Sequence, residues 1–229
     1  LTCEGLSKRY GKGQTALDGV ELHLEPGRIV GLLGPNGSGK TTLIKLANGL
    51  LQPSAGTVKI AGMTPGPETK ALVSYLPDAA YLPDRMQVEQ LVEMFRDFYA
   101  DFDRQKALSM LDTLRLSPDS PLKTLSKGSR EKVQLIMVMS RRAKLYILDE
   151  PIAGVDPAAR DFILKTIIQD YQEDASVLLS THLISDIEPI LDDVIFLKEG
   201  RLLLTSSVED IRDTEHKSVD AYFREGFSC

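Results

Sequence analysis

A glycine-rich loop at residues 34–41 constrains the fold more than any other feature of this chain. It reads Gly-Pro-Asn-Gly-Ser-Gly-Lys-Thr, follows an apolar run at residues 28–33 and leads into a helix predicted over residues 40–49. A strand, such a loop and a helix in this order place backbone N–H groups around phosphate oxygens, at the positive end of the helix. The sequence therefore predicts a phosphate-binding loop at the carboxyl end of a strand.

Two side chains at the end of the loop supply more specific chemistry. The Lys40 ammonium provides a positive charge for the β- and γ-phosphates of a nucleotide, and the Thr41 hydroxyl is a ligand for Mg²⁺. Thr42 is placed to hydrogen-bond an α-phosphate oxygen. The predicted nucleotide-binding residues of this unit are Gly34, Pro35, Asn36, Gly37, Ser38, Gly39, Lys40, Thr41 and Thr42.

Size and charge narrow the class of protein. The chain has 229 residues, 42% of them hydrophobic, and can bury a sizeable core as one large domain or as a domain with a subdomain. Its net charge of -6 argues against a broad nucleic-acid-binding surface, so no nucleic-acid partner is expected. The longest apolar runs, residues 29–33 and 133–139, are far shorter than the roughly 20 residues of a spanning helix, so we do not expect the chain to cross a membrane.

The two ends of the chain indicate the compartment. Cys3 and Cys229 lie far apart in the sequence, without the spacing of a metal site or a disulfide framework. Residues 1–10 lack the apolar core of a signal peptide, and the missing initiator Met suggests a trimmed chain. These observations favour a reducing, cytoplasmic location.

Strand-like and helical segments are unevenly distributed along the chain. Strand-like segments dominate up to residue 77 and return after residue 144, whereas apolar residues recur at helical spacing over residues 88–143. The expected fold class is therefore α/β: a P-loop NTPase core with a mostly parallel sheet, an antiparallel β layer and an inserted α-helical subdomain. Strands are expected at residues 2–6, 20–24, 28–33, 57–60, 72–76, 145–148, 176–179, 193–197 and 201–204, and further helices at 157–172, at 183–191 and at the C-terminus.

Polar side chains follow two of the predicted buried strands. Asp149 and Glu150 come directly after the apolar run 145–148, and His182 follows the strand at 176–179. Open α/β sheets bind ligands at the carboxyl ends of their strands. We expect Asp149 to hold Mg²⁺ through its water, and Glu150 to polarise the attacking water as general base, which favours hydrolysis over transfer to an organic acceptor. His182 is placed to contact the γ-phosphate and to steady that water.

A second phosphate-seeking turn lies far along the chain, at residues 125–130. It reads Leu-Ser-Lys-Gly-Ser-Arg and precedes a helix predicted over residues 129–143. Because one chain already has a complete phosphate-binding loop, we interpret this turn as half of a nucleotide site whose other half belongs to a second molecule.

With these motifs the chain resembles the ATP-binding subunit of an ABC transporter over nearly all of its length. In this likeness, Tyr10 corresponds to the aromatic residue that stacks on adenine, and residues 125–129 correspond to the family signature. Four further motifs match the family: the loop 34–41, the magnesium strand 145–150, the segment Gly154-Val155-Asp156 that crosses the dimer, and the switch histidine His182. All six matches occur along the chain in the order typical of the family.

The resemblance implies an ABC ATPase fold and a mode of action. Residues 1–229 would form one domain, with a RecA-like core and β layer at 1–78 and 142–229 and the helical subdomain at 79–141. A head-to-tail dimer, with an identical chain or with a related ATPase subunit, would hold two ATP molecules with Mg²⁺, and Ser126 and Gly128 of each chain would contact the partner's γ-phosphate. Closing and opening of this dimer would drive a separate multi-span permease, with the chain peripheral on the inner face of the membrane.

Three positions depart from the commonest family sequence. Asp78 replaces the switch glutamine; it can bind Mg²⁺ or its water, but it cannot donate an amide hydrogen bond. Lys127 and Ser129 replace a glycine and a glutamine of the signature, a variation that resembles the branch serving export-type permeases. Either the Lys127 ammonium adds positive charge near the partner's triphosphate, or it points to solvent.

The family docks the coupling helix of its permease near residues 78–102. Met and aromatic residues are frequent there and in the rest of the helical region, a composition that suits either a groove for a partner helix or ordinary core packing. These residues include Met86, Met94, Met110, Met137, Met139, Phe95, Phe98, Tyr99 and Phe102.

Other classes of ATPase are also compatible with a P-loop. A soluble ABC ATPase that works on ribosomes or DNA is the alternative, but such proteins usually carry tandem ATPase units or a long coiled-coil insertion, and this chain has one set of motifs and an acidic balance. A P-loop kinase or GTPase lacks support, because no Asn-Lys-x-Asp segment occurs and neither class explains residues 125–129. The sequence therefore favours the energising ATPase of a transporter, with export as the expected direction.

Overall fold

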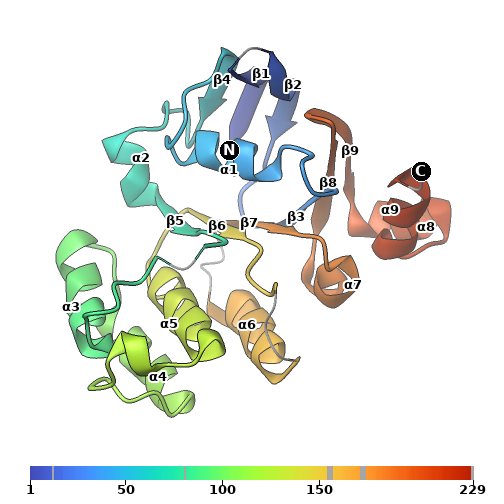
Figure 1. Cartoon of the computed structure of the whole chain (residues 1–229). Helices are drawn as coiled ribbons and strands as arrows, with labels where there is room; N and C mark the ends of the chain where they lie inside the picture. Colours follow the sequence, from blue (N-terminus) through green and yellow to red (C-terminus); the bar gives the residue numbers. More distant parts are fainter. Residues whose placement is uncertain (12, 80, 154–156, 171–173, 228–229) are drawn as a thin grey trace.

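The core of the computed structural model is a six-stranded sheet of mainly parallel strands (Figure 1). The structure describes residues 1–11, 13–79, 81–153, 157–170 and 174–227. The strand order is β5-β6-β7-β3-β8-β9; neighbours are parallel except β8 and β9, which form an antiparallel hairpin. The strands are β3 (Ile29–Leu33), β5 (Val73–Leu76), β6 (Leu145–Asp149), β7 (Ser176–Thr181), β8 (Asp193–Lys198) and β9 (Arg201–Ser207).

The register of this sheet decides which loops meet. β7 lies between β3 and β6, and Asp149 pairs with Ser180 across the β6–β7 ladder. Because parallel strands share one carboxyl edge, the loops that follow β5, β6, β7 and β3 all emerge on the same side of the sheet. These loops contain the polar residues that the sequence singles out.

A second sheet and one helix cover one face of the parallel sheet. The antiparallel strands β1 (Thr2–Tyr10), β2 (Gln14–His23) and β4 (Ala55–Lys59) are ordered β2-β1-β4. Helix α1 (Lys40–Ala47) lies between this sheet and the parallel sheet (Figure 1). Side chains of a strand alternate between faces, so Val30 and Leu32 of β3 pack into this layer.

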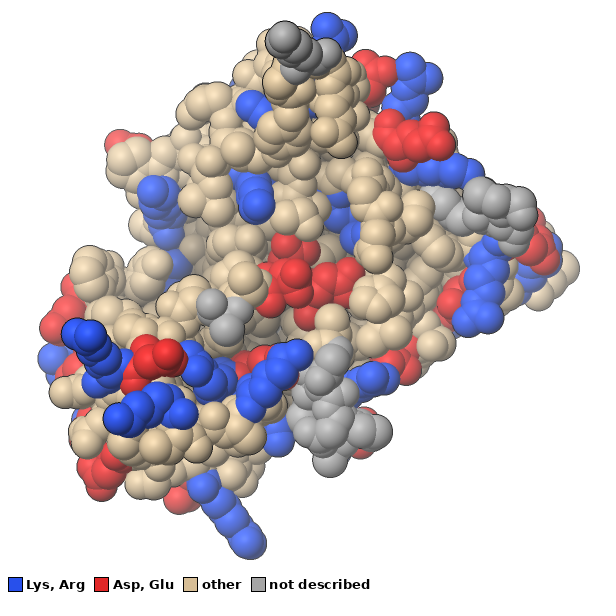
Figure 2. Space-filling view, in the orientation of Figure 1, with Lys and Arg blue, Asp and Glu red and all other residues tan. Residues whose placement is uncertain are grey.

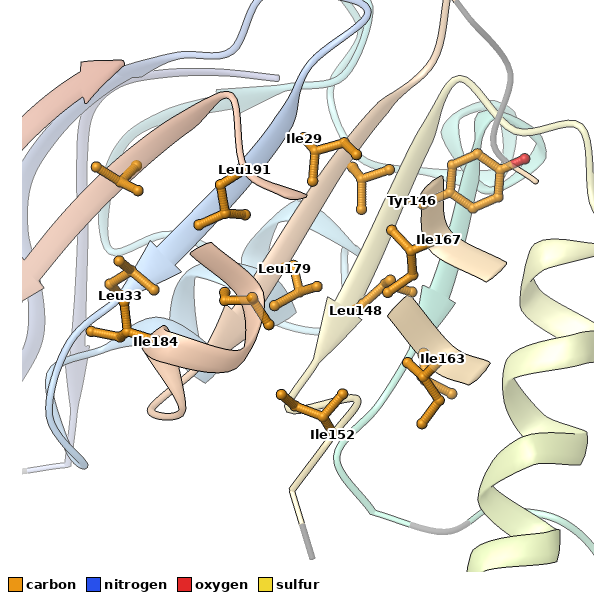
Figure 3. Close-up of a cluster of buried hydrophobic side chains, with 14 of the residues drawn as sticks. Ile29, Leu33, Tyr146, Leu148, Ile152, Ile163, Ile167, Leu179, Ile184 and Leu191 are labelled. Carbon is orange, nitrogen blue, oxygen red and sulfur yellow. The ribbon is translucent and has the colours of Figure 1, made fainter. Parts of the chain in front are cut away.

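Helices cover the opposite face. There, Ile29 and Leu33 of β3 join Leu148 and Leu179 in a buried cluster with side chains of the covering helices (Figure 3). Full burial of each such side chain contributes about 1.5–3 kcal/mol, so the two-sided core is what stabilises the sheet. The helices on this side are α5 (Lys127–Met139), α6 (Pro157–Asp170), α7 (Ile184–Ile187) with a 3-10 turn (Glu188–Ile190), α8 (Val208–Glu215) and α9 (Val219–Phe227).

The chain between residues 82 and 137 has an apolar cluster of its own. This cluster includes Val88 and Leu91 of α3 (Val88–Phe98), Leu111 of α4 (Arg104–Thr113) and Val133 of α5. Helices α3 and α4 lie to one side of the sheet in Figure 1. A 3-10 turn (Leu122–Thr124) connects α4 to α5. Most of the methionines that the sequence singles out are buried or half-buried here, whereas Tyr81 and Phe98 are exposed.

Several segment boundaries differ from those predicted. Strands β1 and β2 are longer than expected, and the predicted strand at 72–76 is preceded by a short helix, α2 (Pro67–Leu72), that the sequence analysis missed. The helix predicted over 183–191 has only four α-helical residues before it tightens into a 3-10 turn that contains Pro189. Proline has no N–H to donate and its ring clashes with the preceding helical turn, which explains the early end.

A buried arginine joins the helical region to the sheet. Arg141 is 3% exposed, pairs with both carboxylate oxygens of Asp101 at 3.1 Å, and donates to the carbonyl oxygens of Lys70, Ala71 and Val73. Its guanidinium lies 3.9 Å from the ring centroid of Tyr99. All five N–H donors of this side chain are therefore used.

We expect Arg141→Ala to lower the free energy of unfolding by about 3–5 kcal/mol, because it leaves a carboxylate and three carbonyl groups without their partner. Urea unfolding followed by circular dichroism measures this loss. The matched control is Arg142→Ala, which removes an exposed ion pair with Asp103 (3.2 Å) and is expected to cost less than about 1 kcal/mol. Equal stabilities for the two variants would contradict the structural role of Arg141.

Candidate nucleotide-binding and catalytic site

The glycine loop connects β3 to α1 through backbone geometry that only glycine accommodates. At Gly39, φ is +111°, and a Cβ atom there would lie 2.5 Å from the carbonyl oxygen of Ala16. At Gly34, a Cβ atom would lie 2.2 Å from the carbonyl oxygen of Leu197. Both approaches are too close for any side chain, so these glycines fix the loop against the neighbouring strands.

Lys40 lies under this loop. Its side chain is buried, and the ammonium donates to the carbonyl oxygens of Gly34 (2.7 Å) and Pro35 (3.2 Å). Burial lowers the pKa of Lys40, and the nearby carboxylates of Glu150 and Asp149 oppose that shift. The predicted phosphate-binding lysine thus faces the two predicted carboxylates across the carboxyl edge of the sheet.

The start of α1 has hydrogen-bonding groups suited to an anion. The first N–H groups of a helix lack intrahelical partners, and α1 has no acidic side chain in its first turn. The Ser38 hydroxyl is buried and has no hydrogen-bond partner among the described residues. Phosphate oxygens would satisfy these donors, and the adjacent Thr41 hydroxyl together with Asp149 is the oxygen donor set that Mg²⁺ prefers.

Asp149 is held by a residue that the sequence analysis did not single out. The carboxylate is 2% exposed and accepts a 2.5 Å hydrogen bond from the Ser180 hydroxyl. Burial raises the pKa of Asp149, the Ser180 hydrogen bond opposes the rise, and the carboxylates of Asp78 and Glu150 add to it. The signal for Ser180 was its place two residues before His182 on the neighbouring strand, which puts it beside Asp149.

Glu150 and His182 are in direct contact. Glu150 Oε2 lies 3.0 Å from His182 Nδ1; the Glu150 side chain is mostly buried, whereas that of His182 is 52% exposed. Glu150 has a φ of +51°, an uncommon conformation for a residue with a side chain, which its N–H stabilises by donating to the carbonyl and hydroxyl oxygens of Ser180. The structure thus brings together the predicted general base and the predicted switch histidine.

Tyr10 lies next to the start of α1. Its hydroxyl is 3.5 Å from the Thr42 hydroxyl, its side chain is partly exposed, and the Lys8 ammonium lies 5.5 Å from the centroid of its ring. An exposed aromatic face at this distance from the phosphate-binding loop can stack on a base.

A cavity of about 660 Å³ separates the carboxylates from the turn at 125–130. Asp78, Asp149 and Glu150 line it together with Leu125 and Lys127. Figure 2 shows Asp and Glu side chains gathered in the central hollow of this face. Among the described residues that line the cavity, none belongs to the loop at 34–42, so the turn and the phosphate-binding loop of one chain do not share it.

The turn itself is the start of a helix. α5 begins at Lys127, two residues earlier than predicted, and the Ser126 hydroxyl caps it by accepting from the N–H of Ser129 at 3.2 Å. Gly128 therefore lies in the first helical turn, where N–H groups have no intrahelical partner. The Lys127 side chain is 76% exposed, with its ammonium 3.8 Å from Glu131 Oε1. The predicted Asp156, with Gly154 and Val155, lies outside the described residues.

This fold and site define a P-loop nucleoside triphosphatase. The family described as ABC transporter matches residues 17–153. The chain therefore belongs to the ABC transporter family, as one of its ATP-binding and ATP-hydrolysing components that use ATP with Mg²⁺.

Individual relatives cover most of the chain. The Nod factor export ATP-binding protein I of Ralstonia nicotianae is 32% identical over 88% of this chain, which spans 65% of that relative's length. A solved ATP-binding subunit of an ABC transporter is 29% identical, with a TM-score of 0.89 and 98% of both chains covered. The dimeric post-hydrolysis structure of the ATP-binding cassette MJ0796, bound to ADP and Pi, shares the fold at 21% identity and a TM-score of 0.78, covering 90% of this chain and 97% of its own.

In the part of the chain that the structure describes, no helix combines the length and the apolar character needed to span a membrane.

Proposed function

We propose that this chain is the ATPase subunit that powers a separate multi-span membrane permease, with export as the direction of transport. The observation that carries the proposal is the contact between Glu150 and His182 beside the buried Asp149, at the sheet edge that also holds the phosphate-binding loop. Co-purification from membranes, with mass spectrometry of the attached protein, tests it. Recovery with ribosomes or DNA would instead favour a soluble ABC ATPase.

Each predicted site residue has a role in this proposal. Glu150 takes a proton from the attacking water, and His182 positions Glu150 and the water. Tyr10 stacks on adenine, and Thr41, Asp149 and Asp78 would hold Mg²⁺, which would supply positive charge against the phosphates. The triphosphate would be bound by Gly34, Pro35, Asn36, Gly37, Ser38, Gly39, Lys40, Thr41 and Thr42, with Ser126, Gly128 and Asp156 acting across a dimer.

The proposal includes a dimer, because Leu125 and Lys127 of the turn line a cavity that the described residues of its own phosphate-binding loop do not. Ser126 and Gly128 at the start of α5 offer a hydroxyl and unpaired N–H groups to a γ-phosphate on a second subunit, identical or related. Binding of ATP by both subunits would close the dimer, and hydrolysis would loosen it. In this arrangement the core comprises residues 1–78 and 142–229, and the helical subdomain residues 79–141.

The permease would bind a groove between the helical region and the sheet, and the chain would be peripheral on the cytoplasmic face of the membrane. A cavity of about 400 Å³ lies there, lined by the aromatic side chains of Tyr75, Tyr81, Phe95 and Tyr99. Tyr81 is exposed, as is Phe98 of α3 at 77%. A concave surface with aromatic walls suits an amphipathic helix from a partner.

We expect Tyr81→Glu to reduce recovery of the permease by at least about 30-fold, because aromatic anchors in such grooves contribute roughly 2 kcal/mol or more. The measurement is the amount of permease that copurifies with the tagged chain from detergent-solubilised membranes. Leu203→Glu is the control, since Leu203 is also exposed (55%, against 42% for Tyr81) but lies on β9, at the opposite edge of the sheet from β5 (Figure 1). Unchanged recovery with Tyr81→Glu would exclude this groove.

A further inference from the structure

An arginine in the first turn of α5 reaches across the cavity to another segment. Arg130 Nη2 donates to the carbonyl oxygen of Leu82 at 3.1 Å and lies 2.7 Å from Asp84 Oδ1. The Arg130 side chain is three-quarters buried, and Asp84 is exposed. The contact joins residues 46 to 48 positions apart in the sequence, so it fixes one part of the fold against another.

The position of Arg130 is unfavourable for the helix alone. α5 has no acidic residue in its first turn, and a positive side chain there adds to the positive end of the helix dipole. Asp84 offsets this charge from outside the helix. Arg130 therefore stabilises the contact between the start of α5 and residues 82–84, and it does not stabilise the helix by itself.

The segment that Arg130 contacts, residues 81–84, lines both cavities. Tyr81 lines the groove described above, Asp78 lines the cavity with Asp149, and Leu82 is buried in the same apolar cluster as Val133 of α5. Leu82 and Arg130 thus connect this segment to the start of α5 through one apolar and one charged contact. A displacement of the segment would be transmitted to the turn that begins α5.

We propose that Arg130 is a positioning residue for ATP hydrolysis: by tying the start of α5 to residues 82–84, it sets the position of Ser126 and Gly128. This rests on the proposed function, in which those two residues contact a nucleotide on a second subunit. Arg130 itself contacts no phosphate in this role. Its loss should leave nucleotide binding by a single subunit intact and impair assembly of the composite site.

The test compares hydrolysis with binding in Arg130→Ala. We expect the protein concentration that gives half-maximal ATPase rate to rise about 10-fold or more, since the removed contact is a charge-assisted hydrogen bond to a folded segment. ATP affinity, measured by fluorescence on dilute protein, should stay within about two-fold, because the phosphate-binding loop is untouched. Arg142→Ala, which removes the exposed ion pair with Asp103, is the matched control and should change neither quantity.

A charge exchange separates positioning from general damage. Arg130→Asp and Asp84→Arg should each impair hydrolysis, and the double variant should restore part of the rate, because opposite charges again face each other although an aspartate at position 130 cannot donate to the carbonyl oxygen of Leu82. Failure of the double variant to recover would overturn the role of this pair even if the single variants are inactive.

Gly128→Asp distinguishes the two proposals. If Gly128→Asp abolishes hydrolysis while Arg130→Ala behaves like the unmodified protein, the positioning role is wrong and the proposed function stands. If Gly128→Asp also leaves hydrolysis unchanged, the turn does not belong to the site and both are overturned.

Discussion

Replacing Glu150 with glutamine is expected to lower the rate of ATP hydrolysis by about 10²–10⁴-fold, the range by which a general base contributes to catalysis. Glutamine keeps the size of the side chain and can still hydrogen-bond His182, whose Nδ1 lies 3.0 Å from the Glu150 carboxylate. It cannot accept the proton of the attacking water. The phosphate-binding loop does not change, so ATP affinity should not fall.

The same variant should accumulate as a dimer when ATP is present. In the proposed function, hydrolysis of ATP releases the second subunit. A dimer that binds ATP without hydrolysing it should therefore stay associated. Size-exclusion chromatography with ATP and Mg²⁺ measures this, beside a rate assay on the same sample. Glu209→Gln, an exposed glutamate at the start of α8, is the control and should keep its rate and its elution volume. Unimpaired hydrolysis by a Glu150→Gln monomer would exclude the assignment.

The arrangement of the candidate catalytic residues could be predicted in part, because a parallel sheet has one carboxyl edge. Asp149 and Glu150 follow one apolar run and His182 follows another, and these runs become adjacent strands in the structure. Strand order and register bring the two residues together, but the contact between Glu150 and His182 also depends on the left-handed backbone of Glu150 (φ +51°), which the sequence analysis did not predict. The glycine loop was predictable for a similar reason, since its spacing permits only one local geometry.

Long-range polar contacts could not be predicted in this way. Arg141 and Asp101 are 40 residues apart and Arg130 and Asp84 are 46 residues apart, and nothing in their local sequence marks them as partners. Charged residues at such positions usually face solvent. Only the packing of the helical region against the sheet shows that Arg141 is buried and that Arg130 bridges two segments.

The start of α5 was predicted less well, although a signal was present. Ser126 is a favoured N-cap residue, and its hydroxyl accepts from the N–H of Ser129, which places the first helical residue at Lys127. The sequence analysis treated residues 125–129 as a turn and placed the start of the helix at residue 129. The outcome matters for function, because unpaired N–H groups at the start of α5 are suited to bind an anion.

Replacing Lys40 with alanine is expected to weaken ATP binding itself by roughly 10- to 150-fold, the equivalent of about 1.5–3 kcal/mol for a hydrogen bond to a charged group. The ammonium is buried under the glycine loop and donates to the carbonyl oxygens of Gly34 and Pro35. A phosphate bound in the loop would be attracted to this ammonium at a site where little solvent screens the interaction. Calorimetric titration with a slowly hydrolysed ATP analogue measures the loss.

Because Lys40 also holds the loop, reduced affinity could arise from a change in loop structure and not from the missing charge. Lys40→Arg separates these causes: it keeps a positive charge but not the compact ammonium that fits between two carbonyl groups. If charge dominates, Lys40→Arg should bind ATP more tightly than Lys40→Ala, and if the fit to the loop dominates, both should bind equally weakly. Lys45→Ala, on the exposed side of the same helix, should bind normally. Undiminished ATP affinity in Lys40→Ala would contradict a phosphate-binding role for Lys40. A loss of turnover alone would not support that role, because Glu150→Gln is expected to lose turnover without losing affinity.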